Sequence, residues 1–522
     1  MNARSLTFLL SVALLGLPTP LVAGDSKTAS TDETVATEGV ATGSFDVSGI
    51  DWAPGASVIV SAKGLKARDK VAVYFDGALI KRLAADALGT VAKTSLVIPA
   101  KTTQGTHRFV FKTDRSGTHA RNIQVSVGWP MQYLNAAGNP VNHNESRIGI
   151  LTVGKLQSMG IWTMLGASTP VVSQGKVWVA DEAMFEKTLQ PISWINSAGQ
   201  FAWAGTAATK GTATILATDE VSSTMPNAAV KTISSINTAT GRIGWTKKLS
   251  TKASNIGLVD DLVYYTTESQ EWLNPPVFGR LHLVNASDGV ERRSFHMGFI
   301  RSDAHFSISG NTIVTTLDSS GQGKTNVVAY NRNTGQTMWD VQFACCMGKP
   351  VIDGGRVYVG SRGQATSYQP TYGNGKIYAL DLRNGSTIWA APQKYGSLNT
   401  DIRGITVAYG RVYATICKDT QNIGYNTSYC ALVSHEQDTG QVRWMKAAKS
   451  KTQKVTVANG LVFTVGDDER TIEAYEALNG TLLWKSVKLY DYPSSTIVVV
   501  NGRVYVTDVQ GNFYVFSING KF

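Results

Sequence analysis

Residues 373–389 read GNGKIYALDLRNGSTIW, and this stretch decides the fold. Residues 376–381 alternate apolar and polar side chains, which predicts a half-buried strand. Asn384-Gly385 then predicts a tight turn, and a tryptophan follows the glycine by four residues. This turn-plus-tryptophan element recurs, with a degenerate copy that we assign to Phe295. Its tryptophans are Trp203, Trp245, Trp339, Trp389, Trp444 and Trp484.

A second recurring element is a buried strand after a turn glycine or aspartate, as in GRVYVGS at 355–361. Both elements occur about eight times, at a spacing of about 38–55 residues. A unit of this size forms one four-stranded blade, which cannot cover both of its faces, so blades stack in a ring.

The two ends of the repeat region complement each other. The last turn, Asn519-Gly520, has no tryptophan strand after it, whereas LQSMGIWTM at 156–164 contains Trp162. We therefore predict that this early strand pairs into the last blade and closes the ring. The predicted fold class is all-β: an eight-bladed β-propeller over 129–522, preceded by a small immunoglobulin-like β-sandwich.

The repeat resembles that of the quinoprotein-type propellers, the family named for pyrroloquinoline quinone (PQQ). The resemblance covers about 129–522, and the lead-in NPVNHNESRIGILTVGKLQSMGIW (139–162) is similar to the entry segment of secreted members. It implies that the six tryptophans dock blades against one another. The family includes PQQ-dependent dehydrogenases. It also includes propellers without quinone, such as the scaffold lipoprotein of the outer-membrane barrel-assembly machinery, so the fold leaves the function open.

The N-terminal 128 residues divide into three segments. Residues 1–24 have Arg4, a 12-residue apolar core and small residues for cleavage, which predicts a signal peptide and a secreted or periplasmic protein. The small polar residues of 25–43 predict a linker. Residues 44–128 alternate in short strands and resemble the immunoglobulin-like modules of bacterial surface proteins. No later apolar run predicts a transmembrane segment.

The net charge is +11, and no block of five or more like charges occurs. We therefore expect no nucleic-acid partner. The expected partner is an unidentified protein or a cell-surface glycan, and the expected state is a monomer.

The four cysteines form two groups. Cys417 and Cys430 flank KDTQNIGYNTSY, so we predict a structural disulfide across a hairpin. Cys345 and Cys346 are adjacent and fall in the crossing between two blades. The resemblance implies a comparison with PQQ alcohol dehydrogenases, in which a disulfide between adjacent cysteines of a comparable loop covers the quinone. A redox site, a structural disulfide or thiol pair, and intermolecular pairing all stay open.

Three consecutive crossings bring charged residues toward the predicted axis. We consider them candidate ligands for a carboxylate, a phosphate or a quinone carboxylate, although we favour the simpler explanation, a solvated face with local ion pairs. The candidate cofactor-binding residues are Arg301, Asp303, Cys345, Cys346, Lys349, Asp401 and Arg403. We predict no metal site, because the seven histidines are scattered and the acidic pairs recur at turns.

These observations favour an exported, non-catalytic propeller that acts as a binding or scaffolding protein without a cofactor. The alternative is a PQQ- and calcium-dependent alcohol or sugar dehydrogenase. Against it, the Gly-Asn-Pro that such enzymes tend to carry after the strand corresponding to 262–265 is absent. Carbohydrate binding through the sandwich or the propeller face is a third possibility.

Overall fold

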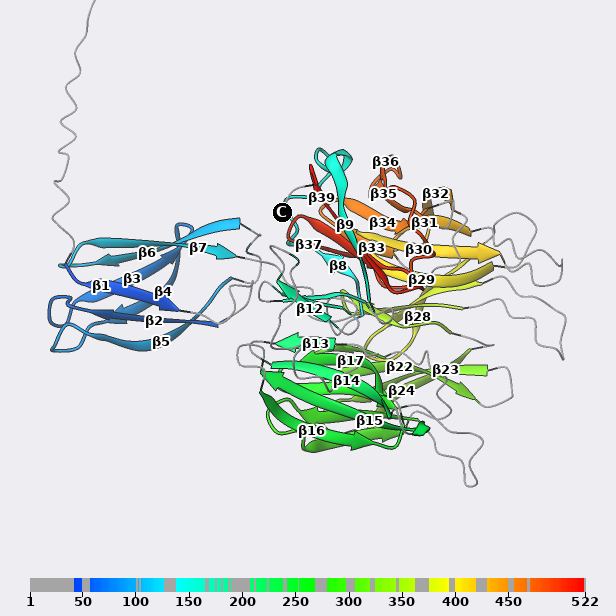
Figure 1. Ribbon diagram of the computed structural model, residues 1–522, viewed down its shortest axis with the longest axis horizontal. Coiled ribbons are helices and arrows are strands. Elements are labelled where there is room, and N and C mark those ends of the chain that lie inside the picture. The colour runs from blue at the N-terminus through cyan, green and yellow to red at the C-terminus, as the bar shows by residue number, and fades with distance from the viewer. Residues whose placement is uncertain are drawn as a thin grey trace, which may run out of the picture.

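The computed structural model describes the following residues: 42–48, 57–99, 102, 105–125, 138–164, 169–173, 176–179, 182–185, 189, 207–210, 213–222, 225–237, 242–251, 253–267, 279–296, 306–319, 324–343, 347–361, 375–393, 400–418, 430–448, 455–466 and 470–520. In this part of the chain, strands dominate and the one helix is a short 3-10 turn, η1 (Val153–Lys155). The predicted all-β class is confirmed (Figure 1).

The N-terminal strands form two antiparallel sheets around a core of their own, which includes Val60, Val73, Phe109 and Phe111. One sheet has the order β1-β2-β5 and the other β4-β3-β6-β7. The strands are β1 (Ser44–Ser48), β2 (Ser57–Lys63), β3 (Lys70–Phe75), β4 (Ala78–Ala84), β5 (Val91–Val97), β6 (Gly105–Thr113) and β7 (Thr118–Val125). The immunoglobulin-like relationship and the boundaries 44–128 stay predictions.

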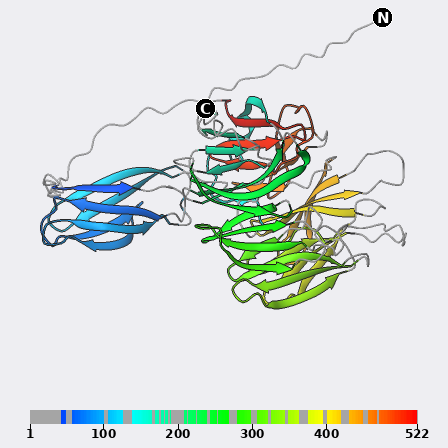
Figure 2. The same cartoon turned by 60° about the horizontal axis from the view of Figure 1, so that its bottom comes forward.

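The remaining strands build successive antiparallel sheets, which Figures 1 and 2 show from two sides. Six of these sheets take only consecutive strands of the chain, as the blades of a propeller do, and the last two each add one strand from the lead-in. The first four sheets contain β10 (Val171–Ser173), β11 (Lys176–Val179) and β12 (Glu182–Phe185); β13 (Ala207–Lys210), β14 (Ala213–Ser222), β15 (Met225–Asn237) and β16 (Ile243–Leu249); β17 (Ala253–Val259), β18 (Leu262–Thr267), β19 (Arg280–Asn285) and β20 (Glu291–His296); β21 (Phe306–Ser309), β22 (Thr312–Ser319), β23 (Lys324–Asn331) and β24 (Thr337–Phe343).

The later four sheets include two strands from the lead-in, β8 and β9. They contain β25 (Val351–Asp353), β26 (Arg356–Gly360), β27 (Lys376–Asp381) and β28 (Thr387–Pro392); β29 (Thr400–Ala408), β30 (Arg411–Lys418), β31 (Cys430–Glu436) and β32 (Val442–Ala448); β33 (Val455–Ala458), β34 (Leu461–Val465), β35 (Ile472–Glu476), β36 (Leu482–Lys485) and β8 (Val141–Asn142); β37 (Val498–Val500), β38 (Arg503–Thr507), β39 (Asn512–Ile518) and β9 (Leu156–Thr163).

The early strand pairs into the last sheet. β9 runs antiparallel to β39, with Trp162 opposite Phe513. One buried cluster then joins this last sheet to the first, through Met164 and Val177 against Tyr505 and Phe513. The prediction for the 156–164 strand is therefore confirmed. The described part holds eight such sheets, but the predicted fourth strand of the first one, with Trp203, lies outside it. The blade count of eight thus stays a prediction.

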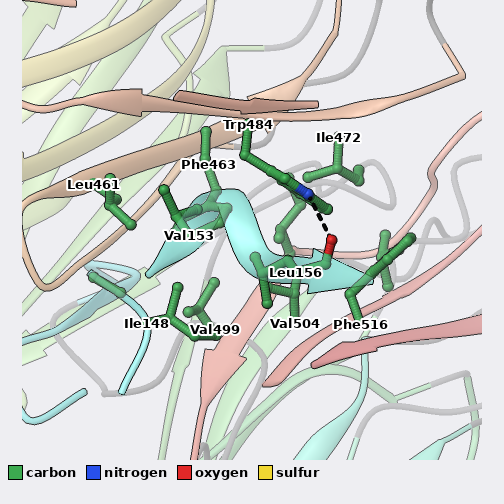
Figure 3. Packing of buried hydrophobic residues seen from close by; sticks show 14 of the residues in the cluster. Ile148, Val153, Leu156, Leu461, Phe463, Ile472, Trp484, Val499, Val504 and Phe516 are labelled. Atoms are coloured by element: carbon green, nitrogen blue, oxygen red, sulfur yellow. Dashed lines mark hydrogen bonds between the residues drawn. The ribbon is translucent and has the colours of Figure 1, made fainter. Parts of the chain in front are cut away.

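Trp484 shows how neighbouring sheets are joined. Its indole Nε1 donates a hydrogen bond of 3.1 Å to the carbonyl of Leu156, at the start of β9 (Figure 3). The same bond, at 2.9–3.1 Å, runs from each of the other described repeat tryptophans to the following sheet. The pairs are Trp245 to Ala286, Trp339 to Leu382, Trp389 to Gln437, and Trp444 to Ala477.

The turn glycine of the repeat packs against the tryptophan of the preceding sheet. A Cβ on Gly440 would lie 2.6 Å from the Trp389 ring, and its φ of +71° also favours glycine. Three further pairs repeat this contact: Gly289 with Trp245, Gly385 with Trp339, and Gly480 with Trp444. The two halves of the sequence motif therefore meet between blades.

The degenerate copy needs a correction. Arg293, not Phe295, takes the tryptophan position, because it lies opposite Leu283 just before the strand irregularity, as Trp245 lies opposite Ser235. Its guanidinium donates to the carbonyls of Asn333 and Thr334 in the next sheet. Phe295 instead points into a buried cluster. Arg293 follows Gly289 by four residues, as tryptophan does in the other copies, so this copy keeps the spacing of the motif with arginine in place of tryptophan.

Hydroxyl side chains on inner strands add a second link between sheets. Ser307, Thr406 and Thr456 each donate a buried bond of 2.6–2.7 Å to a carbonyl at or just before the next first strand. The acceptors belong to Pro350, Val455 and Ile497. Such satisfied buried bonds fix how adjacent sheets meet.

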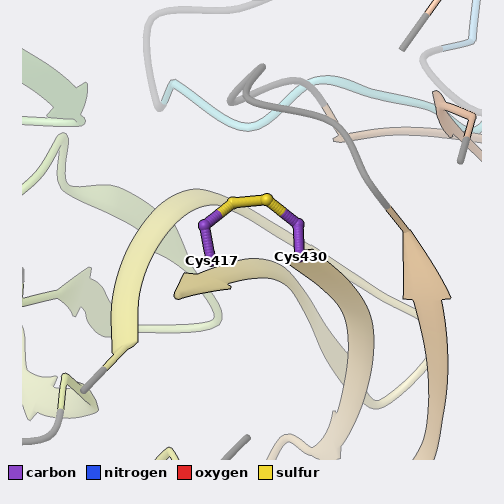
Figure 4. The surroundings of a disulfide bond; sticks show 2 residues. All are labelled: Cys417 and Cys430. Carbon is purple, nitrogen blue, oxygen red and sulfur yellow. A yellow bond between two sulfur atoms is a disulfide. The ribbon is translucent and has the colours of Figure 1, made fainter. Parts of the chain in front are cut away.

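Cys417 and Cys430 form a disulfide between β30 and β31 (Figure 4). The two residues lie directly opposite each other in the ladder, and both side chains are fully buried. The bond therefore links the two strands on either side of residues 419–429 in the sequence.

Candidate functional site

The predicted axial set can be placed only in part. Arg301, Asp303, Cys345 and Cys346 lie outside the described residues. Asp401 and Arg403 lie within strand β29, not in a crossing loop, and their side chains are outside the description. The backbone of Asp401 lies opposite Cys417, and a strand irregularity falls at Arg403. The sequence pattern assigned both residues to the crossing before the strand. The strand β29 begins already at Thr400 and, with 9 residues, is longer than the first strands of the other described sheets.

Lys349 is the one member of the set whose side chain is described. Its Nζ donates a hydrogen bond of 2.9 Å to the carbonyl of Gly138. The residue as a whole keeps intermediate exposure, but burial lowers the pKa of its amine well below the ordinary value of 10.5. A Cβ on Gly138 would lie 2.4 Å from Ser307 Oγ and 2.8 Å from Lys349 Cε. Lys349 thus holds the lead-in segment against the propeller.

The first strands of the sheets surround the axis. Successive first strands contact one another directly, as β21 does with β25, and β29 with β33. Blades converge in this way only near the centre of the ring. A segment that contacts several first strands therefore lies at the axis.

Residues 138–142 make these contacts; we call them the axial segment. The side-chain amide of Asn139 donates to the carbonyl of Val407 at 2.8 Å, and its oxygen accepts from the N–H of Val407 at 3.0 Å. Strand β8 runs parallel to β33, and Asn142 donates to the carbonyl of Val499 in β37 at 2.9 Å. With Gly138 against Ser307, the axial segment contacts the first strands of four sheets.

Glu145 anchors the chain that follows the axial segment. It is 2% exposed, and its carboxylate accepts bonds from the backbone N–H groups of Arg147, Ile148 and Gly502 at 2.8–3.1 Å. Burial is the largest influence and raises the pKa of this carboxyl above its ordinary value of 4.5, against the opposing effect of the N–H donors. A polar residue of the lead-in is thereby locked to the turn between β37 and β38.

A different surface has the properties of a binding site. Between β36 and β37, Tyr490 is 71% exposed and Tyr492 is 46% exposed, and Val487 is exposed in the same loop. Val509, in the turn between β38 and β39, is exposed as well. We call these four residues the tyrosine patch. The sequence stretch KLYDYPSS (488–495) has no strand alternation, and we did not recognise it as a site.

The backbone that carries the tyrosine patch is fixed. The N–H of Tyr490 donates to Tyr514 Oη at 2.9 Å, and that hydroxyl donates to Asp508 at 2.8 Å. The N–H of Val509 donates to the carbonyl of Tyr492 at 3.0 Å, and an isolated bridge pairs Pro493 with Asp508. Two aromatic rings are therefore held in solvent on a well-anchored loop, which suits preorganised recognition.

The comparisons place the propeller in a family. The family model described as outer membrane protein assembly factor BamB matches residues 231–408 and 373–521. The chain belongs to the PQQ-type β-propeller repeat family. Family membership accounts for the repeated strand, turn and tryptophan, and it leaves the ligand open.

Individual relatives are distant. BamB of Burkholderia pseudomallei is 23% identical over 212 residues, which cover 40% of this chain and 51% of that protein. Lupanine 17-hydroxylase [cytochrome c] of a Pseudomonas species is 27% identical over 161 residues, 28% of this chain and 21% of that one. This chain thus spans about half, or less, of these relatives. The crystal structure of BamB from Moraxella catarrhalis is 18% identical, covers 60% of this chain and 95% of that one, and has a TM-score of 0.40.

Two other kinds of site are absent from the part of the chain that the structure describes. Among the described side chains, no group of three or more His, Cys, Asp and Glu is placed to hold a metal ion. Nor does any helix in the described ranges have the length and apolar character needed to cross a membrane.

Proposed function

We propose that this chain is an exported, non-catalytic propeller that binds a protein partner and acts as a scaffold. The tyrosine patch carries the proposal, because it exposes two aromatic rings on a fixed backbone. Tyrosine combines large contact area with few rotatable bonds, and it is enriched at the energetic centres of protein interfaces. The matches to BamB, named as an assembly factor, support a protein partner.

The axial segment supports the same proposal. Asn139 and Asn142 of the axial segment engage the main chain of Val407 and Val499, in the first strands β29 and β37, and β8 pairs with the first strand β33. The amine of Lys349 is likewise turned to a backbone carbonyl. A ligand on this side of the axis would have to displace these buried bonds, so partner recognition fits the outer surface better.

Replacing the two tyrosines tests the proposal. We expect Tyr490→Ser combined with Tyr492→Ser to weaken partner binding at least roughly tenfold, because interface tyrosines are frequent hot spots. Envelope extract of the source organism is passed over the immobilised mature protein, and the enriched polypeptide is then purified and titrated. The control is Leu151→Ser, since Leu151 is 91% exposed in the lead-in.

If the double variant and the control bind the partner with equal affinity, the tyrosine patch is not the binding site.

The enzyme alternative has its own test. Reconstitution with PQQ and Ca²⁺ that gives quinone absorbance and dye-linked alcohol oxidation, abolished by Cys345→Ser, would replace the scaffold with a dehydrogenase.

A further inference from the structure

The N-terminal sandwich holds much of the chain's positive charge. Residues 44–128 contain 12 Lys and Arg against 6 Asp and Glu, a net charge of +6 within a total of +11. The charge is therefore concentrated in one small domain, although no single run of sequence reveals it.

The sheet β4-β3-β6-β7 gathers part of this charge on one face. In β3 and β6, Val71, Val73, Phe109 and Phe111 point into the core, so the residues between them face outward. Lys70, Arg82, Arg108 and Lys112 are all exposed on this outward face, around a half-buried Tyr74. We call Lys70, Arg82, Arg108 and Lys112 the outer basic face.

The register spreads these cations over the sheet. Arg82 in β4 and Lys112 in β6 lie opposite the same residue of β3, Ala72, from its two sides. Two strand spacings separate them by about 10 Å, and the four residue steps from Arg108 to Lys112 span about 13 Å. Lys112 Nζ lies 5.2 Å from the centre of the Tyr74 ring.

Three carboxylates of the sandwich are held by backbone N–H groups, and one of them, that of Asp76, also pairs with His107. Asp69, Asp76 and Asp86 each accept hydrogen bonds from backbone N–H groups. Asp114 follows β6 beside Lys70, at one end of the face. In the described part of the sandwich, no ion pair involves the side chains of Arg82, Arg108 or Lys112. Among the described residues, these three cations therefore have no carboxylate partner.

We propose that the outer basic face binds an acidic polysaccharide. Cationic residues whose backbone positions lie about 10–13 Å apart on one face of a sheet match a polymer with repeated carboxylate or phosphate groups better than one small anion. A bilayer is less suited to this face, because Tyr74 and Val110 at its centre are half-buried and insert nothing into lipid. This activity is separate from protein binding by the tyrosine patch.

The test uses the mature chain and polygalacturonate, with neutral dextran as the uncharged control. The double variant Arg82→Gln with Lys112→Gln removes two charges from the face. The matched control, Lys63→Gln with Lys93→Gln, removes two exposed charges from the opposite sheet, in β2 and β5. Circular dichroism checks that each variant is folded.

We expect binding to polygalacturonate, none to dextran, and an affinity roughly tenfold lower for the outer-face variant, with little change in the control. The affinity falls as salt is added. No binding to polygalacturonate, or equal losses in the two variants, overturns the proposal. Binding to phosphatidylglycerol vesicles but not to polygalacturonate assigns the face to membranes instead.

Discussion

Trp444→Ala is expected to lower the free energy of unfolding of the propeller by about 4 kcal/mol. Trp444 is buried between two sheets, where its Nε1 shares the carbonyl of Ala477 with the hydroxyl of Tyr413. Gly480 of the next turn packs on its ring. Truncation leaves a cavity between the two sheets, and the turn at Gly480 loses the ring against which it packs.

The measurement is chemical denaturation followed by circular dichroism, because the substitution itself changes the tryptophan fluorescence. Arg293→Ala is the matched control at the same register position of another sheet. It removes two hydrogen bonds but no buried ring, so about 1 kcal/mol is expected. Similar losses in the two variants would show that the tryptophans do not dock the blades.

The sequence predicted the fold because each copy of the repeat shows where its strands and its turn lie. Alternation, turn and tryptophan recur together, and the unpaired turn at Asn519-Gly520 pointed to the strand with Trp162. The sequence did not predict which residue each tryptophan contacts, because the spacing within one blade does not reveal that Trp389 packs against Gly440 of the next blade. Likewise, the last sheet has Gly160 at the tryptophan position, and Trp162 folds back to cover it from two residues away.

The candidate site was predicted less well, for a physical reason. The axial segment, GNPVN, has no periodicity, and its asparagines serve main-chain groups far along the chain. The position of Lys349 in the repeat predicts a ligand for an anion, whereas its amine meets a backbone carbonyl. Tyr490 and Tyr492 resemble ordinary loop residues in the sequence, since exposure and anchoring are properties of the folded loop. The local sequence pattern specifies strands and turns. Only the tertiary contacts show whether a cationic side chain holds parts of the fold together or can bind a ligand.

Glu145→Ala is expected to cost about 3 kcal/mol in unfolding free energy. The carboxylate is the acceptor for three backbone N–H groups, and its loss leaves the N–H groups of Ile148 and Gly502 buried, and that of Arg147 partly buried, without an acceptor. The anchor of the lead-in to the turn before β38 is lost as well. Glu145→Gln keeps one acceptor oxygen, so a smaller loss is expected in the same denaturation experiment.

The pH dependence of Glu145→Gln reveals which influence controls the carboxyl. Burial raises the folded-state pKa of Glu145 above its unfolded value, so its protonation stabilises the fold. That contribution is complete below the unfolded pKa and is lost as the pH rises through the folded pKa. The substituted amide cannot titrate, so the stability of the wild type minus that of Glu145→Gln should fall as the pH rises above the ordinary carboxyl pKa of 4.5. A difference that instead grows with pH would mean that the three N–H donors outweigh burial, and that the lead-in is anchored by an ionised carboxylate.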